Sequence, residues 1–430
     1  MILRRFKYFM PERNEFSLAG EETLLSVSEY YGVKPRAEAF DDSSAESRAG
    51  SLEGYRIVKA GDFVMNYMLA WKGAYGVSDH DGIVSPAYAV YKINPIYADR
   101  RFIHHRLRSE HMRSVFRAKS KGIIESRLRL YPDAFLSMEL ELPDLSTQKT
   151  IADFLDRETA RIDQLIEKKQ RLLVVARERK ANFILSAVTQ GLNSEAQLSP
   201  SGLAWAPQLP SHWKPTRLRH LGQSIIGLTY SPDDLTSDGQ GVPVLRANNI
   251  QAGRLISDGL VFVSKAVPDK LILREGDILI CSRNGSRNLI GKNARASGEF
   301  LGMTFGAFNT VYRSKYSDFI YWVLQSPIFS YQAGAYLTST INQLTVTTLG
   351  NLVVPMPPIQ EQKAICSYIE ERMPVFDGLL DKVQASLSKL QELRAALITA
   401  AVTGQIDLAT WDKQGQTERR LDQILEAMRA

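Results

Sequence analysis

The chain has 430 residues, a length that predicts two to four domains because single hydrophobic cores stop growing well below it. Hydrophobic residues make up 44% and charged residues 23%, as is ordinary for a soluble globular protein, and the net charge of +6 is small enough that its distribution matters more than its sum. The two cysteines, Cys281 and Cys366, lie far apart in sequence and exclude a disulfide framework or a cysteine zinc site. Neither a secretion signal nor a run of about 18 apolar residues occurs, so we expect a cytoplasmic protein.

The first 142 residues alternate short strand-like runs with turn residues. Within them, residues 56–65 predict a strand, a Gly-Asp turn and a second strand. A long helix is expected next. Its start is marked by Leu142-Pro143, because proline disfavours helix in the residue before it, and its end by Gly191. At about 1.5 Å per residue, roughly 43 helical residues would extend about 65 Å.

The second half of the chain repeats this order. Residues 193–215, rich in Ser, Pro and Gly, carry Trp205 and Trp213 and favour an ordered linker docked by its tryptophans. The mixed region continues to residue 355, and residues 271–280 again predict a strand, a Gly-Asp turn and a strand.

A second long helix is expected between Met356-Pro357-Pro358 and Gly404. A short amphipathic helix is predicted near residues 421–428.

The two halves are related by an internal duplication. Residues 143–189 return without a gap as residues 357–403, at an offset of 357 − 143 = 214 positions. The Gly-Asp turn at Gly61 returns at Gly276, an offset of 215, so the duplication extends beyond the helices. Such a chain is expected to have internal two-fold pseudo-symmetry, which suits a two-fold ligand.

Both helices carry apolar rows with coiled-coil spacing, interrupted by Lys169, Lys180 and Arg394. Long basic side chains can lay their stems along such a seam while the charge reaches water. The sequence permits either relative direction of the helices, and we favour antiparallel because it is compatible with a two-fold relation between the halves. The predicted seam residues are Leu155, Ile162, Ile166, Leu173, Phe183, Ile369, Phe376, Leu380, Val383, Leu387 and Leu390.

The motifs that suggest catalysis are incomplete. Gly285 to Lys292 resembles a phosphate loop, but five residues separate its glycines instead of four, and Asn293 stands where Ser or Thr must bind Mg²⁺. Asn94-Pro95-Ile96-Tyr97 falls one residue short of the Asn-Pro-Pro-aromatic signature of amino-methyltransferases. The histidines lack partners at metal or triad spacing. We therefore expect a chain without catalytic, cofactor-binding or metal-binding residues.

A basic segment lies between Arg101 and Leu130, where nine Lys and Arg residues stand against Glu110 and Glu125, a local excess of 9 − 2 = +7. It is either a solvated helix face or a phosphate-facing footprint on a polyanion. The candidate DNA-binding residues are Arg101, Arg106, Arg108, Arg113, Arg117, Lys119, Lys121 and Arg127.

In the second half, two segments combine arginine with asparagine, whose side chains can pair bidentately with guanine and adenine edges. A polar surface loop that uses asparagine for turn geometry is an equal alternative. The candidates are Arg246, Asn248, Asn249, Arg283, Asn284, Arg287, Asn288 and Lys292. These segments differ between the halves while the helices agree, as expected if the helices are a scaffold and the variable domains bind different targets.

Several motifs together are similar to one known family. The most specific are the two helix entries, Leu142-Pro143 to Gln148-Lys149 and Pro357-Pro358-Ile359-Gln360-Glu361-Gln362-Lys363, each followed by a long helix ending in Ala-Val-Thr. With Ala70-Trp71-Lys72-Gly73-Ala74 and Pro210-Ser211-His212-Trp213, they resemble the specificity subunit of type I restriction-modification systems over essentially the whole chain. The family more often has an acidic residue at the position of Thr147, a departure that we expect to weaken one helix cap.

The resemblance implies an α+β fold. Two globular mixed α/β target-recognition domains would be separated by two long helices forming an antiparallel coiled coil, with internal pseudo-two-fold symmetry. The expected segments are the first target-recognition domain at 1–146, the central long helix at 147–191, the linker and second target-recognition domain at 192–355, the second long helix at 356–404 and the tail helix at 405–430.

The same resemblance implies a non-catalytic subunit of a type I restriction endonuclease and adenine-N6 DNA methyltransferase complex. It would bind a bipartite site in double-stranded DNA, with two methyltransferase subunits on its helices, restriction/translocase subunits outside them and no membrane contact. S-adenosylmethionine, ATP and Mg²⁺ would be bound by those partners. Two alternatives remain open, a stand-alone DNA methyltransferase and a coiled-coil interaction scaffold without a DNA role.

Overall fold

The structure, a computed structural model, describes residues 2–39, 51–124, 127–236, 239–334, 343–406 and 408. Its contacts divide the chain into two compact units. Unit 1 consists of Met1–Arg171 and Lys382–Ala430, and unit 2 of Leu172–Asp381. Each unit therefore combines one globular domain with a part of both long helices. The tail helix predicted near residues 421–428 lies outside the described residues.

Unit 1 is built around an aromatic core. Its strands are β1 (Ile2–Arg5), β2 (Leu25–Ser28), β3 (Gly32–Pro35), β4 (Arg56–Val58), β5 (Phe63–Asn66), β6 (Tyr75–Val77), β7 (Gly82–Val84), β8 (Tyr88–Tyr91) and β9 (Glu139–Leu142). Its short helices are α1 (Phe6–Phe9), α2 (Arg36–Ala39), η2 (Ala70–Lys72), α3 (Arg100–Arg108), α4 (Glu110–Lys119) and α5 (Pro132–Ser137). The antiparallel sheet β6-β5-β8 packs Phe63 against Phe135 of α5, with stacked rings 5.6 Å apart, and Phe116 of α4 completes the cluster.

Unit 2 contains two four-stranded sheets among its described residues. Its strands are β10 (Leu198–Leu203), β11 (Ala206–Pro210), β12 (Thr216–Arg217), β13 (Gly222–Ile226), β14 (Leu235–Thr236), β15 (Val242–Leu245), β16 (Ile250–Gln251), β17 (Arg254–Leu255), β18 (Val261–Val263), β19 (Ile278–Cys281), β20 (Asn293–Arg295), β21 (Thr304–Phe305), β22 (Asn309–Ser314) and β23 (Val353–Val354). Its short helices are η4 (Leu218–His220), η5 (Pro232–Asp234), η6 (Ala247–Asn249), η7 (Asp269–Leu271), η8 (Arg287–Leu289), η9 (Gly298–Phe300), α7 (Ser317–Gln325), α8 (Pro327–Gly334) and α9 (Val346–Asn351). One sheet has the order β13-β22-β19-β20 and the other β14-β18-β15-β21.

The two globular domains repeat one topology. In unit 1, β5 pairs antiparallel with β6 and β8, and in unit 2, β19 pairs in the same way with β20 and β22. Three short helices follow each of these sheets, α3 to α5 in unit 1 and α7 to α9 in unit 2. The terminal strand pairs β1-β9 and β12-β23 also correspond. The duplication seen in the helices therefore includes the domains.

The Gly-Asp turns also correspond. Gly61 and Gly276 have positive φ angles of 99° and 78°, which side chains with a Cβ rarely adopt. In both turns the aspartate carboxylate accepts the backbone N–H of the residue three positions earlier, at 2.8 and 2.9 Å, and forms an ion pair of 2.6 Å with an arginine. The aspartate stabilises each turn, and the strand that follows it, β5 or β19, lies inside its sheet.

The strand predicted for residues 271–274 is wrong. Leu271 instead ends the 3-10 helix η7, whose backbone bonds begin at the carbonyl of Pro268. Leu273 makes two backbone bonds with residues 302–303, donating to the carbonyl of Met303 at 2.8 Å and accepting the N–H of Gly302 at 3.1 Å, but no β ladder continues from them. Local turn bonds thus take the place of a β ladder in this segment.

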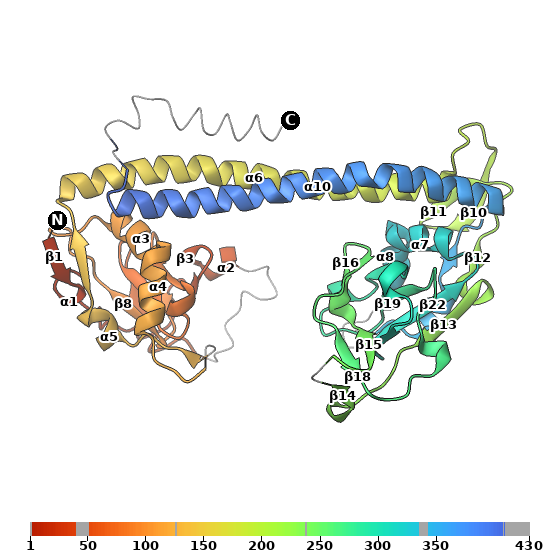
Figure 1. Cartoon of the computed structure of the whole chain (residues 1–430). Helices are drawn as coiled ribbons and strands as arrows, with labels where there is room; N and C mark the ends of the chain where they lie inside the picture. Colours follow the sequence, from red (N-terminus) through yellow and green to blue (C-terminus); the bar gives the residue numbers. More distant parts are fainter. Residues whose placement is uncertain are drawn as a thin grey trace. The chain divides into compact units, whose positions relative to one another are not determined.

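The long helices are α6 (Leu145–Gln190, 46 residues) and α10 (Ile359–Val402, 44 residues), which run antiparallel in both units (Figure 1). In unit 1, Leu155 and Ile162 from the beginning of α6 share a core with Leu390 from the last part of α10. In unit 2, the ring of Phe183 near the end of α6 lies 5.3 Å from that of Phe376. The predicted seam residues that are buried are Leu155, Ile162, Leu173, Ile369, Val383, Leu387 and Leu390, and those that are half-buried are Ile166, Phe183, Phe376 and Leu380.

Two of the residues that interrupt the apolar rows form ion pairs between the helices. In unit 1, Arg394 donates to both carboxylate oxygens of Asp163 at 2.7 and 3.1 Å. In unit 2, the Lys180 ammonium lies 2.6 Å from Asp377. The two pairs correspond under the offset of 214, since 163 + 214 = 377 and 180 + 214 = 394. Asp163 on α6 corresponds to Asp377 on α10, and Lys180 on α6 corresponds to Arg394 on α10, so the two helices exchange roles. This exchange is what a two-fold relation between antiparallel helices requires.

Both long helices begin with the same glutamine contact. Gln148 and Gln362 are buried, and each donates its amide to the carbonyl of the proline five residues before it, at 2.8 and 2.7 Å. The expectation that Thr147 weakens the first cap is wrong, because the carboxylate of Asp144 accepts the backbone N–H of Thr147 at 2.9 Å.

At the second helix, Glu361 anchors the linker. Its carboxylate accepts hydrogen bonds from Trp213 Nε1 at 2.9 Å and His212 Nε2 at 2.7 Å. Trp213 is buried and Trp205 half-buried against the core of unit 2, so both tryptophans dock the linker. Among the described helices, none is long and apolar enough to cross a membrane.

Candidate nucleic-acid interface

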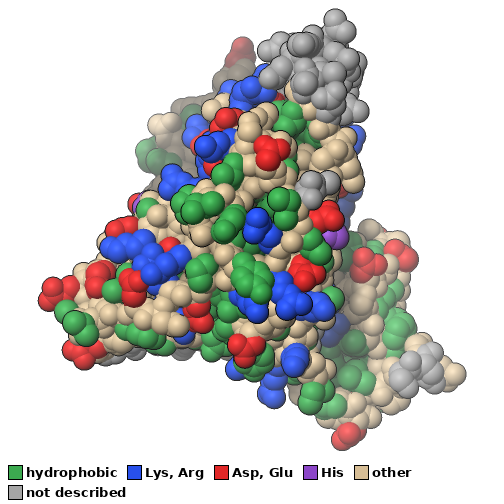
Figure 2. Space-filling view, turned by 90° about the vertical axis from the view of Figure 1, so that its left-hand side faces the viewer, with side chains coloured by type: hydrophobic (Ala, Val, Ile, Leu, Met, Phe, Trp, Pro, Cys, Tyr) green, Lys and Arg blue, Asp and Glu red, His purple; other side chains and the backbone are tan. Residues whose placement is uncertain are grey.

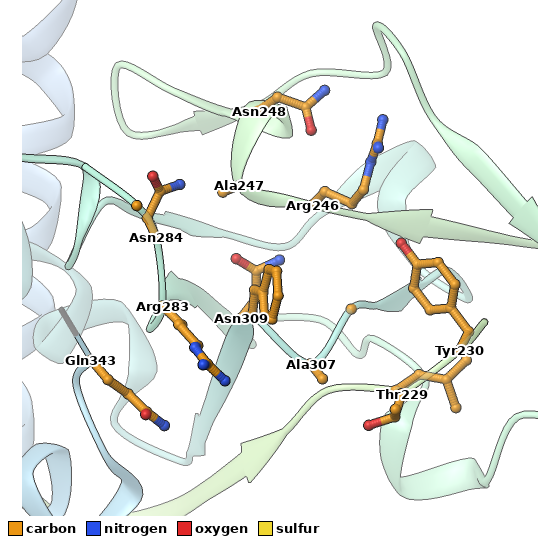
Figure 3. A pocket seen from close by; sticks show the side chains of 14 residues that line it. Thr229, Tyr230, Arg246, Ala247, Asn248, Arg283, Asn284, Ala307, Asn309 and Gln343 are labelled. Carbon is orange, nitrogen blue, oxygen red and sulfur yellow. The ribbon is translucent and has the colours of Figure 1, made fainter. Parts of the chain in front are cut away.

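Unit 2 contains a cavity of about 1160 Å³, formed by loops that meet at the ends of its strands (Figure 3). The loop after β15 contributes Arg246 and Asn248, and the loop after β19 contributes Arg283 and Asn284. The two arginine-asparagine segments, separated by more than 30 residues in sequence, thus line one cavity. The remaining lining residues are Leu228, Thr229, Tyr230, Ala247, Gly285, Gly306, Ala307, Phe308, Asn309 and Gln343.

The loop after β15 is shaped by Asn249. This side chain is completely buried; its oxygen accepts the backbone N–H of Arg246 at 2.9 Å, and its amide donates to the carbonyls of Ile256 and Asp258 at 3.0 and 2.9 Å. Asn249 therefore stabilises the turn, which was the alternative to a base contact that the sequence left open. It is not part of the candidate interface. Arg246 donates to a loop carbonyl at 2.8 Å, and Asn248 is exposed.

The loop after β19 is held by the backbone of Phe308. Its carbonyl accepts the N–H groups of Ser282 and Arg283 at 3.0 and 2.9 Å. The Arg283 guanidinium lies 5.5 Å from the centroid of the Phe308 ring, which is 61% exposed. An arginine stacked on an aromatic ring at a cavity rim offers both donors and a flat apolar surface to a base.

The remaining candidates of this loop lie outside the described lining of the cavity. Arg287 begins η8 and is exposed, whereas Lys292 is half-buried and its backbone carbonyl accepts the N–H of Cys281 at 2.8 Å. The side chain of Asn288 lies outside what the structure describes. A role of these three residues in DNA binding stays a prediction.

Tyr230, Phe308, Asn309 and Gln343 were missed by sequence reasoning. Phe308 and Asn309 are adjacent, whereas Tyr230 and Gln343 are single residues elsewhere, and none of these segments has the arginine-asparagine pattern that marked the other loops. Only Phe308, an aromatic residue that follows Gly306 and Ala307, carries a weak local signal of an exposed ring.

In unit 1, the basic segment divides into buried and exposed cations. Arg108 donates to four backbone carbonyls, those of Gly73, Tyr75, Glu29 and Tyr30, and burial lowers its pKa to about 10. These contacts tie α3 to the sheet and to the β2-β3 hairpin. The side chain is therefore already used inside the fold, and we leave it out of the interface.

Two further cations of α3 are also drawn inward. Arg101 pairs with Asp153 and Asp156 of α6 at 2.7 and 2.9 Å. Burial lowers the pKa of Arg106, whose Nε and Nη1 atoms have no hydrogen-bond partner among the described residues. Arg101 is thus used to join α3 to α6, and the guanidinium of Arg106 is largely buried, so the assignment of either arginine to a phosphate footprint gains no support from the geometry.

The cations that follow α3 are exposed. Lys121 and Arg129 face each other across an antiparallel bridge with two backbone bonds of 2.9 Å. Like charges opposite each other in such a pair are destabilising without a counterion. The tip of this hairpin carries Ile123 and Ile124, which are 102% and 50% exposed. The exposed candidates are Arg113, Arg117, Lys119, Lys121 and Arg127.

On the face of the molecule that Figure 2 shows, basic side chains form small groups separated by acidic and apolar side chains. In sequence, four exposed cations gather on the hairpin and just before it, namely Lys119, Lys121, Arg127 and Arg129. A polyanion would neutralise the facing charges of such a hairpin.

Equivalent loops of the two units carry different side chains. The β5-β6 loop (67–74) and the β19-β20 loop (282–292) both contain a 3-10 helix followed by a glycine with positive φ, 105° at Gly73 and 88° at Gly291. The unit 1 loop contains the buried Trp71 and the exposed Lys72, whose ammonium lies 5.1 Å from the Trp71 ring centroid, whereas the unit 2 loop contributes Arg283 and Asn284 to the cavity. One backbone frame therefore carries different side chains in the two units.

A metal site or a reactive cysteine thiol would indicate a different kind of functional site. In the described parts of both units, groups of three His, Cys, Asp or Glu residues that could hold a metal ion are not found. Both cysteines are buried, and burial raises the pKa of Cys366 to about 12, which keeps its thiol protonated. The cavity with its amides and guanidinium groups is suited to hydrogen bonding, the chemistry of recognition.

Comparisons with known proteins agree with this description. Residues 210–372 match the family model of the type I restriction modification DNA specificity domain. The chain is 29% identical over 212 residues to the type I restriction enzyme EcoKI specificity subunit of Escherichia coli K12, and 28% identical over 213 residues to the StySPI specificity subunit of Salmonella potsdam. Each match covers 47% of this chain and 45% of the relative, so the chain spans about half the length of the curated relatives it matches.

A solved structure from work on complex assembly and conformational transition of the type I restriction-modification system shares the fold. It matches with a TM-score of 0.62 at 17% identity, over 93% of this chain and 97% of that one. Residues 210–372 therefore match a type I restriction modification DNA specificity domain, and the α+β fold of the chain is shared with that solved structure.

Proposed function

We propose that this chain is the non-catalytic, sequence-specific DNA-binding subunit of a type I restriction-modification complex. One observation carries the proposal: all residues lining the cavity of unit 2 fall within residues 210–372, the part that matches the DNA specificity domain. The cavity presents arginine and asparagine side chains at the ends of strands, and these residue types recognise base edges through paired hydrogen bonds.

The target would be bipartite and need not be palindromic. The two units share the topology and the helix pairing but differ in the loops that carry recognition chemistry. Each unit would bind one half-site, and different loops would select different bases. The EcoKI and StySPI relatives are themselves described as specificity subunits.

The partners would be two methyltransferase subunits and the restriction/translocase subunits. Exposed apolar side chains on the long helices of unit 2 offer a surface for protein contacts: Leu172, Val174, Val175, Val375 and Leu379 are 40 to 74% exposed. S-adenosylmethionine, ATP and Mg²⁺ would be held by these partners, which would perform methylation and cleavage.

A selection experiment tests the proposal. The assembled complex of the chain with its methyltransferase subunits would be incubated with a randomised DNA duplex library, and the bound duplexes sequenced. We expect a split motif with a spacer of fixed length. Replacing Arg283 and Asn284 by alanine should change base preference in one half-site and leave the other intact.

The matched control is Lys315→Gln, which removes an exposed cation of unit 2 outside the described cavity lining. Equal loss of binding to all DNA after the Arg283 and Asn284 changes would indicate a phosphate role instead. Binding of S-adenosylmethionine by the purified chain alone would support a stand-alone methyltransferase. Absence of any enriched motif would favour an interaction scaffold.

A further inference from the structure

The cavity of unit 2 contains a buried hydrogen-bond acceptor without a partner. Asn309, the first residue of β22, lines the cavity and is 1% exposed. Its Nδ2 donates to the carbonyl of Leu245 at 3.3 Å, and its Oδ1 has no hydrogen-bond partner among the described residues. In Figure 3, the Asn309 amide lies amid the labelled side chains, between Arg246 and Arg283 in this view.

The orientation of this amide is fixed by the backbone around it. The N–H of Asn309 donates to the carbonyl of Gly306 at 2.8 Å, and its carbonyl accepts the N–H of Gly227 at 3.1 Å. Nδ2 of Asn309 donates to the carbonyl of Leu245, so turning the amide over would break that hydrogen bond and place Oδ1 against the carbonyl oxygen. At this position the side chain therefore offers the cavity an acceptor, Oδ1, and not a donor.

Such an acceptor is unusual in a folded protein. Buried polar groups are nearly always paired, and one that stays unpaired destabilises the fold. A second polar atom of the same cavity is in the same state, since Nε of Arg246 is buried and without a partner in the described structure. Both atoms come from residues that line an open cavity of about 1160 Å³, so a ligand that enters it can satisfy them.

The acceptor selects among DNA bases by a simple rule. In the major groove, adenine and cytosine present exocyclic amino donors, N6 and N4, whereas guanine and thymine present only acceptors there. Guanine or thymine would place an oxygen against Asn309 Oδ1.

We propose that Asn309 is a specificity-determining residue that accepts a hydrogen bond from the exocyclic amino group of an adenine or cytosine in the half-site bound by unit 2. This inference rests on the proposed function.

Unit 1 provides an internal comparison. Asn309 stands opposite Cys281 in the β19-β22 pair, and the corresponding position opposite Asn66 in the β5-β8 pair is Tyr88. An amide acceptor at this position is therefore specific to unit 2, since the Tyr88 hydroxyl can also donate. Changes at Asn309 should leave recognition of the other half-site as it is.

The test uses DNA analogues that lack one amino group. After the motif has been selected, each adenine of both half-sites is replaced by nebularine and each cytosine by 2-pyrimidinone, one base per duplex. Dissociation constants of the assembled complex are then measured. For the native chain, we expect one position in the unit 2 half-site whose replacement weakens binding about tenfold or more. Whether that position is adenine or cytosine identifies the base.

Two variants connect this loss to Asn309. Asn309→Ala should bind native and analogue duplexes alike at that position. Asn309→Asp keeps the Oδ1 acceptor and should retain the discrimination, but its second oxygen faces the carbonyl of Leu245, so we expect a lower melting temperature. Melting temperatures of both variants show whether they fold. The inference is overturned if no amino group of the unit 2 half-site matters to the native chain, or if Asn309→Ala discriminates as the native chain does. Failure to select any DNA motif would instead overturn the proposed function itself.

Discussion

Replacing Lys119, Lys121 and Arg127 by glutamine should reduce the salt dependence of DNA binding. These three side chains are exposed at the end of α4 and on the hairpin that follows it. Arg101 and Arg108 belong to the same basic segment but have partners inside the fold: Arg101 pairs with two carboxylates, and Arg108 donates to backbone carbonyls. Only cations that meet phosphate release counterions, so only the exposed set should contribute to the salt slope.

The magnitude follows from the number of contacts. Each phosphate contact on duplex DNA contributes about 0.9 to the slope of log K against log salt, so losing three contacts should lower the slope by about 2.7. Between 50 and 200 mM salt, a fourfold range, the affinity of the triple variant should fall about 40-fold less than that of the native chain. Fewer true contacts would give a proportionally smaller change.

Fluorescence anisotropy of the assembled complex on its selected duplex, at several salt concentrations, measures the slope. The matched control is Arg5→Gln, which removes a cation that is 54% exposed but paired with Glu139. Arg108→Gln should leave the slope unchanged while destabilising unit 1 by about 3 kcal/mol, because buried carbonyls lose a charged donor. An unchanged slope in the triple variant, or an equal fall in the Arg5 control, would refute the reasoning.

Three further predictions concern an ion-pair comparison, a buried histidine and the length of a helix. Asp377→Asn should lower the free energy of unfolding by about 1–2 kcal/mol, because the Asp377 side chain is 26% exposed and has two cationic partners. Asp163→Asn should lower it by less than about 1 kcal/mol, because the Asp163 side chain is 50% exposed and has one such partner. Equal effects of the two variants in urea unfolding would contradict this. Burial lowers the pKa of His104 to about 3, so the unfolded chain takes up its proton first as the pH falls below about 6.5. The free energy of unfolding should therefore decrease by up to about 1.4 kcal/mol per pH unit as the pH falls from about 6.5 to 3. Thermal melts of His104→Gln should show a smaller decrease over this range. If NMR showed that His104 titrates near pH 6.5 in the folded chain, the prediction would be disproved. Inserting four residues after Gln190 should alter the spacer of the selected motif, and altered half-sites would count against a measuring role of the helices.

The helices could be predicted from local sequence because their determinants are local. Apolar spacing and proline at the entries fix where α6 and α10 form, and their bounds fall within three residues of those expected. The antiparallel direction rested on the duplication, and contacts such as Asp163 with Arg394 show it in the structure. Lys180 and Arg394 were recognised as interruptions of the seam, but their carboxylate partners lie about 200 residues away and could not be identified locally.

The candidate binding residues were predicted less completely. Composition marked Arg108 and Lys119 as equivalent cations of one basic segment, yet the first is enclosed by carbonyls of three other segments and the second is exposed. Likewise, Asn248 and Asn249 are neighbours of one type, but one is exposed at the cavity and the other shapes the turn. Side-chain direction in a loop depends on its backbone bonds, which composition does not encode.

By itself, the sequence determined that the chain is duplicated, that each copy contains a mixed domain and a long helix, and that these helices carry complementary apolar rows. Periodicity, proline and glycine act over a few residues, so these properties are written locally. Tertiary structure alone decided which arginines and asparagines face solvent and which support the fold. It also brought Arg246, Arg283 and Asn309 to one cavity. The end of β19 pairs with the start of β22 in one sheet, and Asn309 donates to the carbonyl of Leu245 at the end of β15 in the other sheet, although more than 60 residues separate Leu245 from Asn309.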